Sequence, residues 1–178
     1  ERGLNFSPFS NVVLAPNHYT VGLLTPAVDR EAELTALHDI ATTIQTAETH
    51  SEAAEQTVAA AADILDFHIC NITIHEDGWL VPYAVSEGSP EDGTRPMRDD
   101  QGLAGKTFQT GESQVVDNVT GEEADPADEA YRSGLSVPIG DHGVFQAAST
   151  EPAAFDELDV ERAELLVSHT AGALARIE

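Results

Sequence analysis

The chain has 178 residues and is strongly acidic, because 32 Asp and Glu residues oppose only 8 Lys and Arg residues. Its formal net charge is -24 at pH 7, and hydrophobic residues make up 41% of the sequence. This length and apolar content suffice for one domain with a real core. Nucleic-acid binding requires clustered Lys and Arg, whereas the basic residues here are scattered, so we expect no nucleic-acid partner.

The acidic residues are spread along the chain, and Lys106 is the only lysine. Such a surface repels itself in dilute buffer, but at molar salt the Debye length falls to about 3 Å and like charges scarcely interact. Disorder is an alternative for acidic chains, yet the periodic apolar segments described below argue against it. The composition therefore indicates adaptation to a cytoplasm at molar salt.

Cys70 is the only cysteine, which excludes an intramolecular disulfide and a metal site built from cysteines. It alternates with Ile72 and Ile74 in a β-branched run, as a buried core residue does. No apolar run is long enough to span a bilayer, and the N-terminus lacks the order of a signal peptide. We expect a cytoplasmic piece of a larger protein, without metal or cofactor.

Residues 3–28 contain no Asp, Glu, Lys or Arg, unlike the rest of the chain. Pro8, Pro16 and Pro26 argue against a long helix in this segment. The apolar runs at 12–15 and 18–24 predict two short strands around a turn. We interpret residues 1–28 as a linker or the end of an upstream module, and residues 29–178 as the domain.

From residue 29 the apolar spacing becomes helical, and a capping pattern at 49–51 predicts a second helix over 51–65. The first of these helices carries a stripe at alternating spacings of three and four, formed by Leu34, Leu37, Ala41 and Ile44. The β-branched run at 69–74 and the apolar run at 79–86 predict two strands joined by a tight turn.

The remaining elements follow from shorter patterns. Residues 87–100 are polar and predict a loop, and 102–110 predict a short helix that ends at Gly111. A short strand is expected at 114–116, followed by an acidic surface loop. The last helix is expected to begin near Phe155 and to run to the end of the chain.

Residues 132–150 predict a β-hairpin, because two short apolar runs flank the turn Gly-Asp-His-Gly. We expect Ile139 to pair with Val144, which places Ser136 and Gln146 on opposite faces. Both faces are mostly apolar, so the hairpin should lie inside a sheet that is covered on both sides.

Three segments resemble the GAF family of small-molecule sensor domains, in the order in which that family has them. They are QGLAGKTFQTGESQVVDN, RSGLSVPIGDHGVFQAAST and EPAAFDELDVERAELLVSHTAGAL. The resemblance runs from about Asp29 to the end of the chain. It implies an α+β fold in α/β/α layers, with a central antiparallel sheet of five or six strands. The N- and C-terminal helices are expected on one face of the sheet, and the short helix and loops over the other.

The resemblance implies a non-enzymatic sensory or regulatory domain of a haloarchaeal signal-transduction protein, upstream of a histidine kinase module. It would bind a small molecule between the sheet and residues 87–118, or relay a signal through a helical dimer without a ligand. Two alternatives are the regulatory domain of a transcription factor and a catalytic GAF-like enzyme. The enzyme is disfavoured because the sequence offers no nucleophile with a base, and Cys70 has no resolving partner.

We expect Tyr83, Phe108, Ser136 and Gln146 to surround a small, mostly uncharged ligand, because a pocket needs a few polar groups among apolar walls. The predicted pairing separates Ser136 from Gln146, so only one of them would face the ligand.

Other polar residues are given structural roles. His68, His75 and His142 lack the spacing of a metal site. We interpret Asp156, Glu157 and Asp159 as a helix cap rather than as the cyclic-nucleotide motif of a GAF subgroup.

The final helix carries a stripe at alternating steps of three and four, formed by Val160, Ala163, Val167, Thr170, Leu174 and Ile177. This is the period of a coiled-coil seam, so we expect a parallel homodimer through the terminal helices. The alternative is that the stripe packs on the domain's own sheet.

The net charge of -24 predicts that folding depends on salt. We expect the melting temperature followed by circular dichroism to rise between dilute buffer and molar KCl, because screening reduces carboxylate repulsion. Equal melting temperatures in both buffers would contradict the halophilic interpretation.

Overall fold

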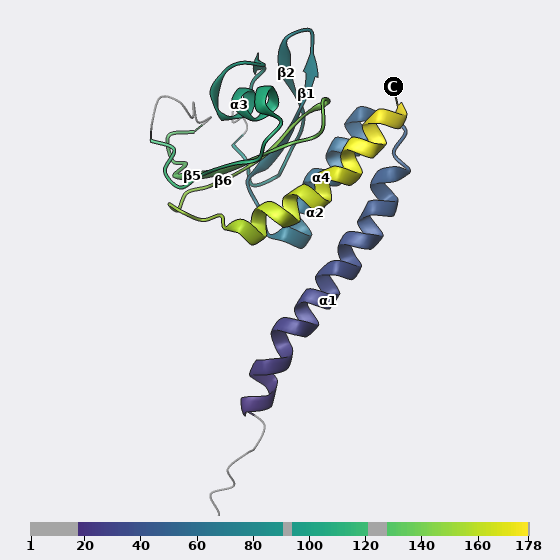
Figure 1. Ribbon diagram of the computed structural model, residues 1–178, viewed down its shortest axis with the longest axis vertical. Helices are drawn as coiled ribbons and strands as arrows, with labels where there is room; N and C mark the ends of the chain where they lie inside the picture. The colour runs from purple at the N-terminus through teal and green to yellow at the C-terminus, as the bar shows by residue number, and fades with distance from the viewer. Residues whose placement is uncertain (1–17, 91–93, 121–127, 178) are drawn as a thin grey trace, which may run out of the picture. The chain divides into compact units, whose positions relative to one another are not determined.

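The computed structural model describes residues 18–90, 94–120 and 128–177 (Figure 1). Its helices are α1 (His18–Gln45), α2 (His50–Leu65), α3 (Gly102–Thr110) and α4 (Glu157–Ile177). Its strands are β1 (Cys70–Glu76), β2 (Trp79–Val85), β3 (Met97–Arg98), β4 (Gln114–Val116), β5 (Ser133–Pro138) and β6 (Gly143–Ser149). The chain divides into two units, Glu1–Leu34 and Thr35–Glu178, and the second contains the sheet.

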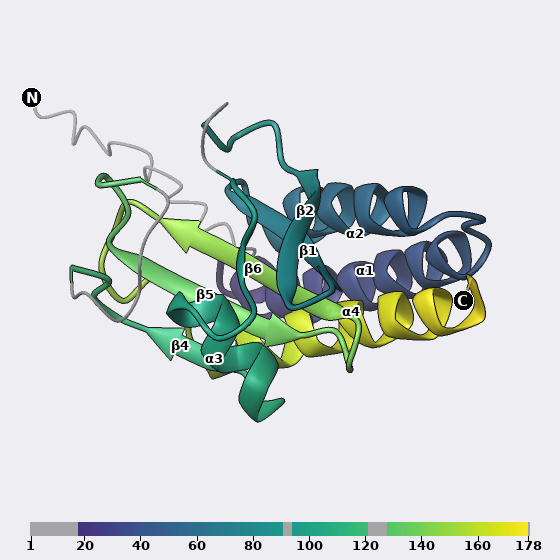
Figure 2. The same ribbon diagram turned by 90° about the horizontal axis from the view of Figure 1, so that it is seen from above.

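The six strands form one antiparallel sheet in the order β3-β2-β1-β6-β5-β4. Helices α2 and α4 pack side by side on one face, and α3 lies over the other (Figures 1 and 2). The predicted fold class is therefore confirmed. Strand β3 was missed, because its two residues lie in a stretch that is polar in sequence.

The main core lies between the sheet and the helices α2 and α4. Ile72, Leu135, Val137 and Phe145 project toward these helices and are fully or almost fully buried. In α2 the core is built from small residues, chiefly alanines, so the helix lies close to the sheet. The smaller apolar cluster on the α3 side contains Leu80, Ala104 and Val144.

The predicted register of the β5–β6 hairpin is wrong by one residue. Pro138, not Ile139, pairs with Val144, and Ser136 pairs with Gln146. The loop is one residue shorter than expected, since Ile139 N donates to Gly143 O at 2.9 Å and Gly143 belongs to β6. Gly143 is also paired with Ile74 of β1, where its lack of a side chain lets the two backbones approach.

The strand predicted over residues 18–24 is also wrong, because these residues belong to α1. The other strand of that pair, at 12–15, lies outside the described residues. Pro26 stands inside the helix, where it removes one backbone hydrogen bond. Local strand preference is a weak signal that the context of a longer helix overrides.

The stripe on α4 that we interpreted as a dimer seam packs on the domain's own core. Ala163, Val167, Thr170 and Leu174 are buried, and Thr170 Oγ1 lies 2.7 Å from Thr57 Oγ1 of α2. Alternating spacings of three and four also suit the packing of two helices within one molecule. The intermolecular assignment of these residues is therefore wrong.

Replacing Gly143 by Ala should lower the free energy of unfolding by about 2–4 kcal/mol, because the added methyl group would overlap the carbonyl oxygen of Thr73. Gly172→Ala is the matched control, since α4 leaves open space at that position. We expect the control to gain about 0.5–1 kcal/mol from helix propensity. Guanidinium unfolding in high salt measures both, and an unchanged Gly143→Ala variant would contradict the β1–β6 packing.

Candidate functional site

Four neutral polar residues form a row across four strands of the sheet. Asn71 pairs with Gln146, Gln146 with Ser136, and Ser136 with Gln114. Residues that stand opposite one another on antiparallel strands project from the same face. The hydroxyl of Ser136 lies 2.8 Å from that of Thr107 in α3, so this face is the one under α3. We call these four residues the polar row.

The polar row has unused hydrogen-bonding capacity at its β1 end, at Asn71. Ser136 and Thr107 are fully buried, and Thr107 Oγ1 also donates to Leu103 O at 2.9 Å. The buried Oδ1 atom of Asn71 accepts no hydrogen bond from any described residue. Because a buried polar atom without a partner costs free energy, Asn71 marks a place where a polar ligand would be favoured.

Apolar and aromatic groups lie on the same face of the sheet as the row, under α3. The ring of His75 stacks on that of Phe108 in α3, with centroids 4.6 Å apart and planes inclined by 22°. His75 Nε2 lies 2.9 Å from Asp99 Oδ2, and Phe108 packs on the small cluster under α3. These contacts join α3 and its preceding loop to the sheet. None of them involves the side chains of the polar row, whose polar groups are all neutral.

The structure places three of the four predicted ligand-binding residues on the α3 side of the sheet. Ser136 and Gln146 are neighbours on one face because of the corrected register, and Phe108 lies on the same side. Tyr83 lies on the opposite face, under α2, because a β-bulge at Ile72/Thr73 inserts one extra residue into β2. The ligand-binding role of these residues stays a prediction.

Tyr83 has a structural contact instead. Its hydroxyl donates a short hydrogen bond to Glu76 Oε1, and this bond and then partial burial raise the pKa of Tyr83 above its ordinary value. Sequence reasoning missed Asn71, Gln114 and Thr107; of these, only Asn71 stands out as a polar residue beside apolar neighbours. Only the strand pairing and the packing of α3 show that these three residues lie on the face of the sheet that carries Ser136 and Gln146.

Cys70 is buried on the helix side, with Sγ 3.8 Å from Val58 O. Burial raises the pKa of its thiol to about 12, and the hydrogen bond with Ser86 offsets this only in part. Because the thiolate is the nucleophilic form, this thiol is chemically inert near neutral pH. Its position is that of a core residue.

The histidines do not converge. His68 pairs with Asp66 at 2.7 Å, and His75 pairs with Asp99. Within residues 18–90, 94–120 and 128–177, no three His, Cys, Asp or Glu side chains are placed to hold a metal ion. Over the same ranges, no helix combines the length and the apolar character that crossing a membrane requires.

The match to a family model decides the family: the model described as GAF domain covers residues 47–175. The chain belongs to the GAF domain family. A comparison with curated proteins found no match.

Several solved structures have a similar fold. A protein from Burkholderia vietnamiensis described as a GAF sensor is 21% identical, with a TM-score of 0.73 over 84% of this chain and 98% of that one. The GAF domain of an Acinetobacter phosphoenolpyruvate-protein phosphotransferase is 22% identical, with a TM-score of 0.72 over 82% and 93%. The free methionine-R-sulfoxide reductase from Neisseria meningitidis is 19% identical, with a TM-score of 0.68 over 98% of both chains. At these sequence identities the comparison shows a similar fold and does not extend to function.

Native Cys70 should not react with Ellman's reagent at pH 8, because the thiol has a pKa of about 12 and is buried. Reaction should follow unfolding in guanidinium. The pKa is also raised relative to the unfolded value of 9.0, so the unfolded state loses this proton first and stability should fall as pH rises from 9 to 12. Rapid stoichiometric labelling of the native protein would show that the thiol is accessible after all.

Proposed function

We propose that this GAF domain is a non-enzymatic sensor that binds a small uncharged molecule at the polar row. The observation that carries the proposal is the buried Asn71 Oδ1, which has no hydrogen-bond partner among the described residues and lies in the same row as Gln146 and Ser136. Carboxamide and hydroxyl groups both donate and accept hydrogen bonds, so the row suits a neutral ligand that offers both. The apolar contacts of Phe108 supply the wall against which such a ligand packs.

The parent protein is proposed to be a signal-transduction protein of a halophilic archaeon, with a histidine kinase module after this domain. Membership of the GAF family supports a sensory role, and the net charge of -24 with a single lysine supports a high-salt cytoplasm. The regulatory domain of a transcription factor would look the same over these residues. The sequence that follows Glu178 in the gene distinguishes the two.

An enzymatic role is disfavoured by the chemistry of the described residues. Cys70, the single cysteine, lies on the helix side of the sheet, opposite to the polar row. Its high pKa leaves almost no thiolate near neutral pH. We therefore propose ligand sensing rather than sulfoxide reduction, although one structural relative is a reductase.

Gln146→Leu tests the proposed site, because it removes the central carboxamide and roughly preserves the side-chain volume. Gln146 has no side-chain hydrogen bond among the described residues, so the fold should be kept. In a thermal-shift screen of neutral nucleobases, nucleosides and amides in molar KCl, we expect compounds that stabilise the wild type to bind this variant about tenfold more weakly. Gln45→Leu, at the exposed end of α1, should leave binding unchanged. The proposal is wrong if no compound stabilises the wild type, or if Gln146→Leu responds equally.

We further propose a homodimer formed through α4, using the exposed Leu158 and Leu165 instead of the buried stripe. These side chains are 38% and 44% exposed and lie two helical turns apart on one face. Leu165→Asp should convert a dimer to a monomer, as measured by light scattering in molar KCl. Val115→Asp is the control, since Val115 is 40% exposed on β4, and it should leave the mass unchanged. A monomeric wild type would refute the dimer.

A further inference from the structure

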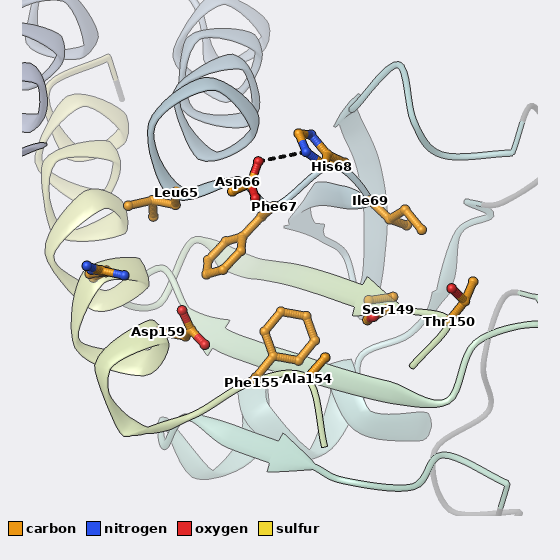
Figure 3. Close-up of a pocket in the computed structure, with 12 residues that line it drawn as sticks. Leu65, Asp66, Phe67, His68, Ile69, Ser149, Thr150, Ala154, Phe155 and Asp159 are labelled. Carbon is orange, nitrogen blue, oxygen red and sulfur yellow. Dashed lines mark ion pairs between the residues drawn. The ribbon is translucent and has the colours of Figure 1, made fainter. Parts of the chain in front are cut away.

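A cavity lies at the end of the domain where the chain passes from α2 to β1 and from β6 to α4 (Figure 3). Its volume is about 450 Å³, within the range of small-molecule sites. It shares no lining residue with the polar row or with α3. A ligand in this cavity would therefore act separately from one bound at the row.

Two aromatic rings and one carboxylate meet in this cavity. The rings of Phe67 and Phe155 are 5.6 Å apart and inclined by 76°, so they form a corner. The carboxylate of Asp159 lies beside both rings (Figure 3). A cation placed between the carboxylate of Asp159 and the aromatic corner would interact with a ring face and a negative charge at once.

The carboxylate of Asp159 is held in place by the start of α4. Asp159 Oδ2 accepts from Asp156 N at 3.0 Å, and Asp156 Oδ1 accepts from Asp159 N at 3.0 Å. This capping box involves only one oxygen of Asp159. The helix cap expected from the sequence is therefore present. The carboxylate of Asp159 belongs both to this cap and to the cavity lining.

The cavity walls are held by contacts outside the cavity. Ser133 Oγ donates to Glu151 O at 2.6 Å and accepts from Ala154 N at 3.3 Å, which ties down the loop before Phe155. Asp66 and Ala153 both have a left-handed backbone, with φ of 63° and 50°. Asp66 is the left-handed C-cap of α2, and Phe67 N donates to Ala61 O at 3.0 Å, which fixes the chain at this wall of the cavity.

The charges favour a cation over an anion. Asp66 and Asp159 both line the cavity. Arg162 is the one arginine in the lining, and His68 is paired with Asp66. Aromatic faces carry negative potential as well, so an anion would meet repulsion from the rings and from the acids.

We propose that this cavity binds an organic ammonium cation, whose alkyl groups contact Phe67 and Phe155 and whose charge is balanced by Asp159. The site is independent of the proposed function at the polar row.

Choline and its uncharged isostere 3,3-dimethylbutan-1-ol test the proposal, since they share a shape and differ in charge. In an amide NMR titration at constant ionic strength, we expect choline to shift residues 65–69 and 148–159 and to bind at least about fivefold more tightly than the isostere. The amides of the polar row should not move. Equal affinities for the two compounds, no binding, or shifts elsewhere would each overturn the proposal.

Two variants separate charge from shape. Asp159→Asn keeps a side-chain oxygen for the Asp156 N–H and removes the charge, and Phe155→Leu keeps apolar volume and removes the ring. Each should abolish the preference for choline while leaving the melting temperature within a few degrees. Glu161→Gln, an exposed position of α4 outside the cavity, is the control and should keep the preference. A preference that survives in both Asp159→Asn and Phe155→Leu would exclude the site.

Discussion

The close approach of β6 to β1 at Gly143 is the constraint on which the rest of the sheet depends. Opposite Ile74, only a residue without a Cβ avoids the carbonyl oxygen of Thr73, and this fixes the position of β6 between β1 and β5. A slip of one residue would turn every side chain of β6 to the other face. Phe145 would leave the helix core, and Gln146 would enter it.

Much of the fold follows from the sequence, because helical stripes and β-branched runs are strong local signals. The capped start of α2 at Thr49, the end of α3 at Gly111 and the antiparallel sheet apart from β3 were all predictable. The hairpin register was not, because Gly140 and Gly143 both look like turn residues in the sequence. Gly143 belongs to β6 because it pairs with Ile74 of β1, about seventy residues earlier in the chain.

The candidate site was predictable only in part for the same reason. Ser136, Gln146 and Phe108 were identified from residue type, whereas Asn71 and Gln114 become neighbours of these residues only through strand pairing. Tyr83 was misplaced because a β-bulge leaves no clear mark in a sequence. The result is an uncharged row under α3 in a chain of net charge -24, and a separate acidic, aromatic cavity where α2 leads into β1 and β6 leads into α4.

The most direct test of this account is the pairing of β5 with β6 in solution. The hydrogen bond from Ile139 N to Gly143 O makes that pair hydrogen-bonded, so by alternation Ser136 and Gln146 form a non-hydrogen-bonded pair with closely spaced Cα atoms. We therefore expect a strong nuclear Overhauser effect between the Hα protons of Ser136 and Gln146. A strong Hα–Hα effect between Val137 and Gln146 would instead show the slipped register, and the polar row would not exist.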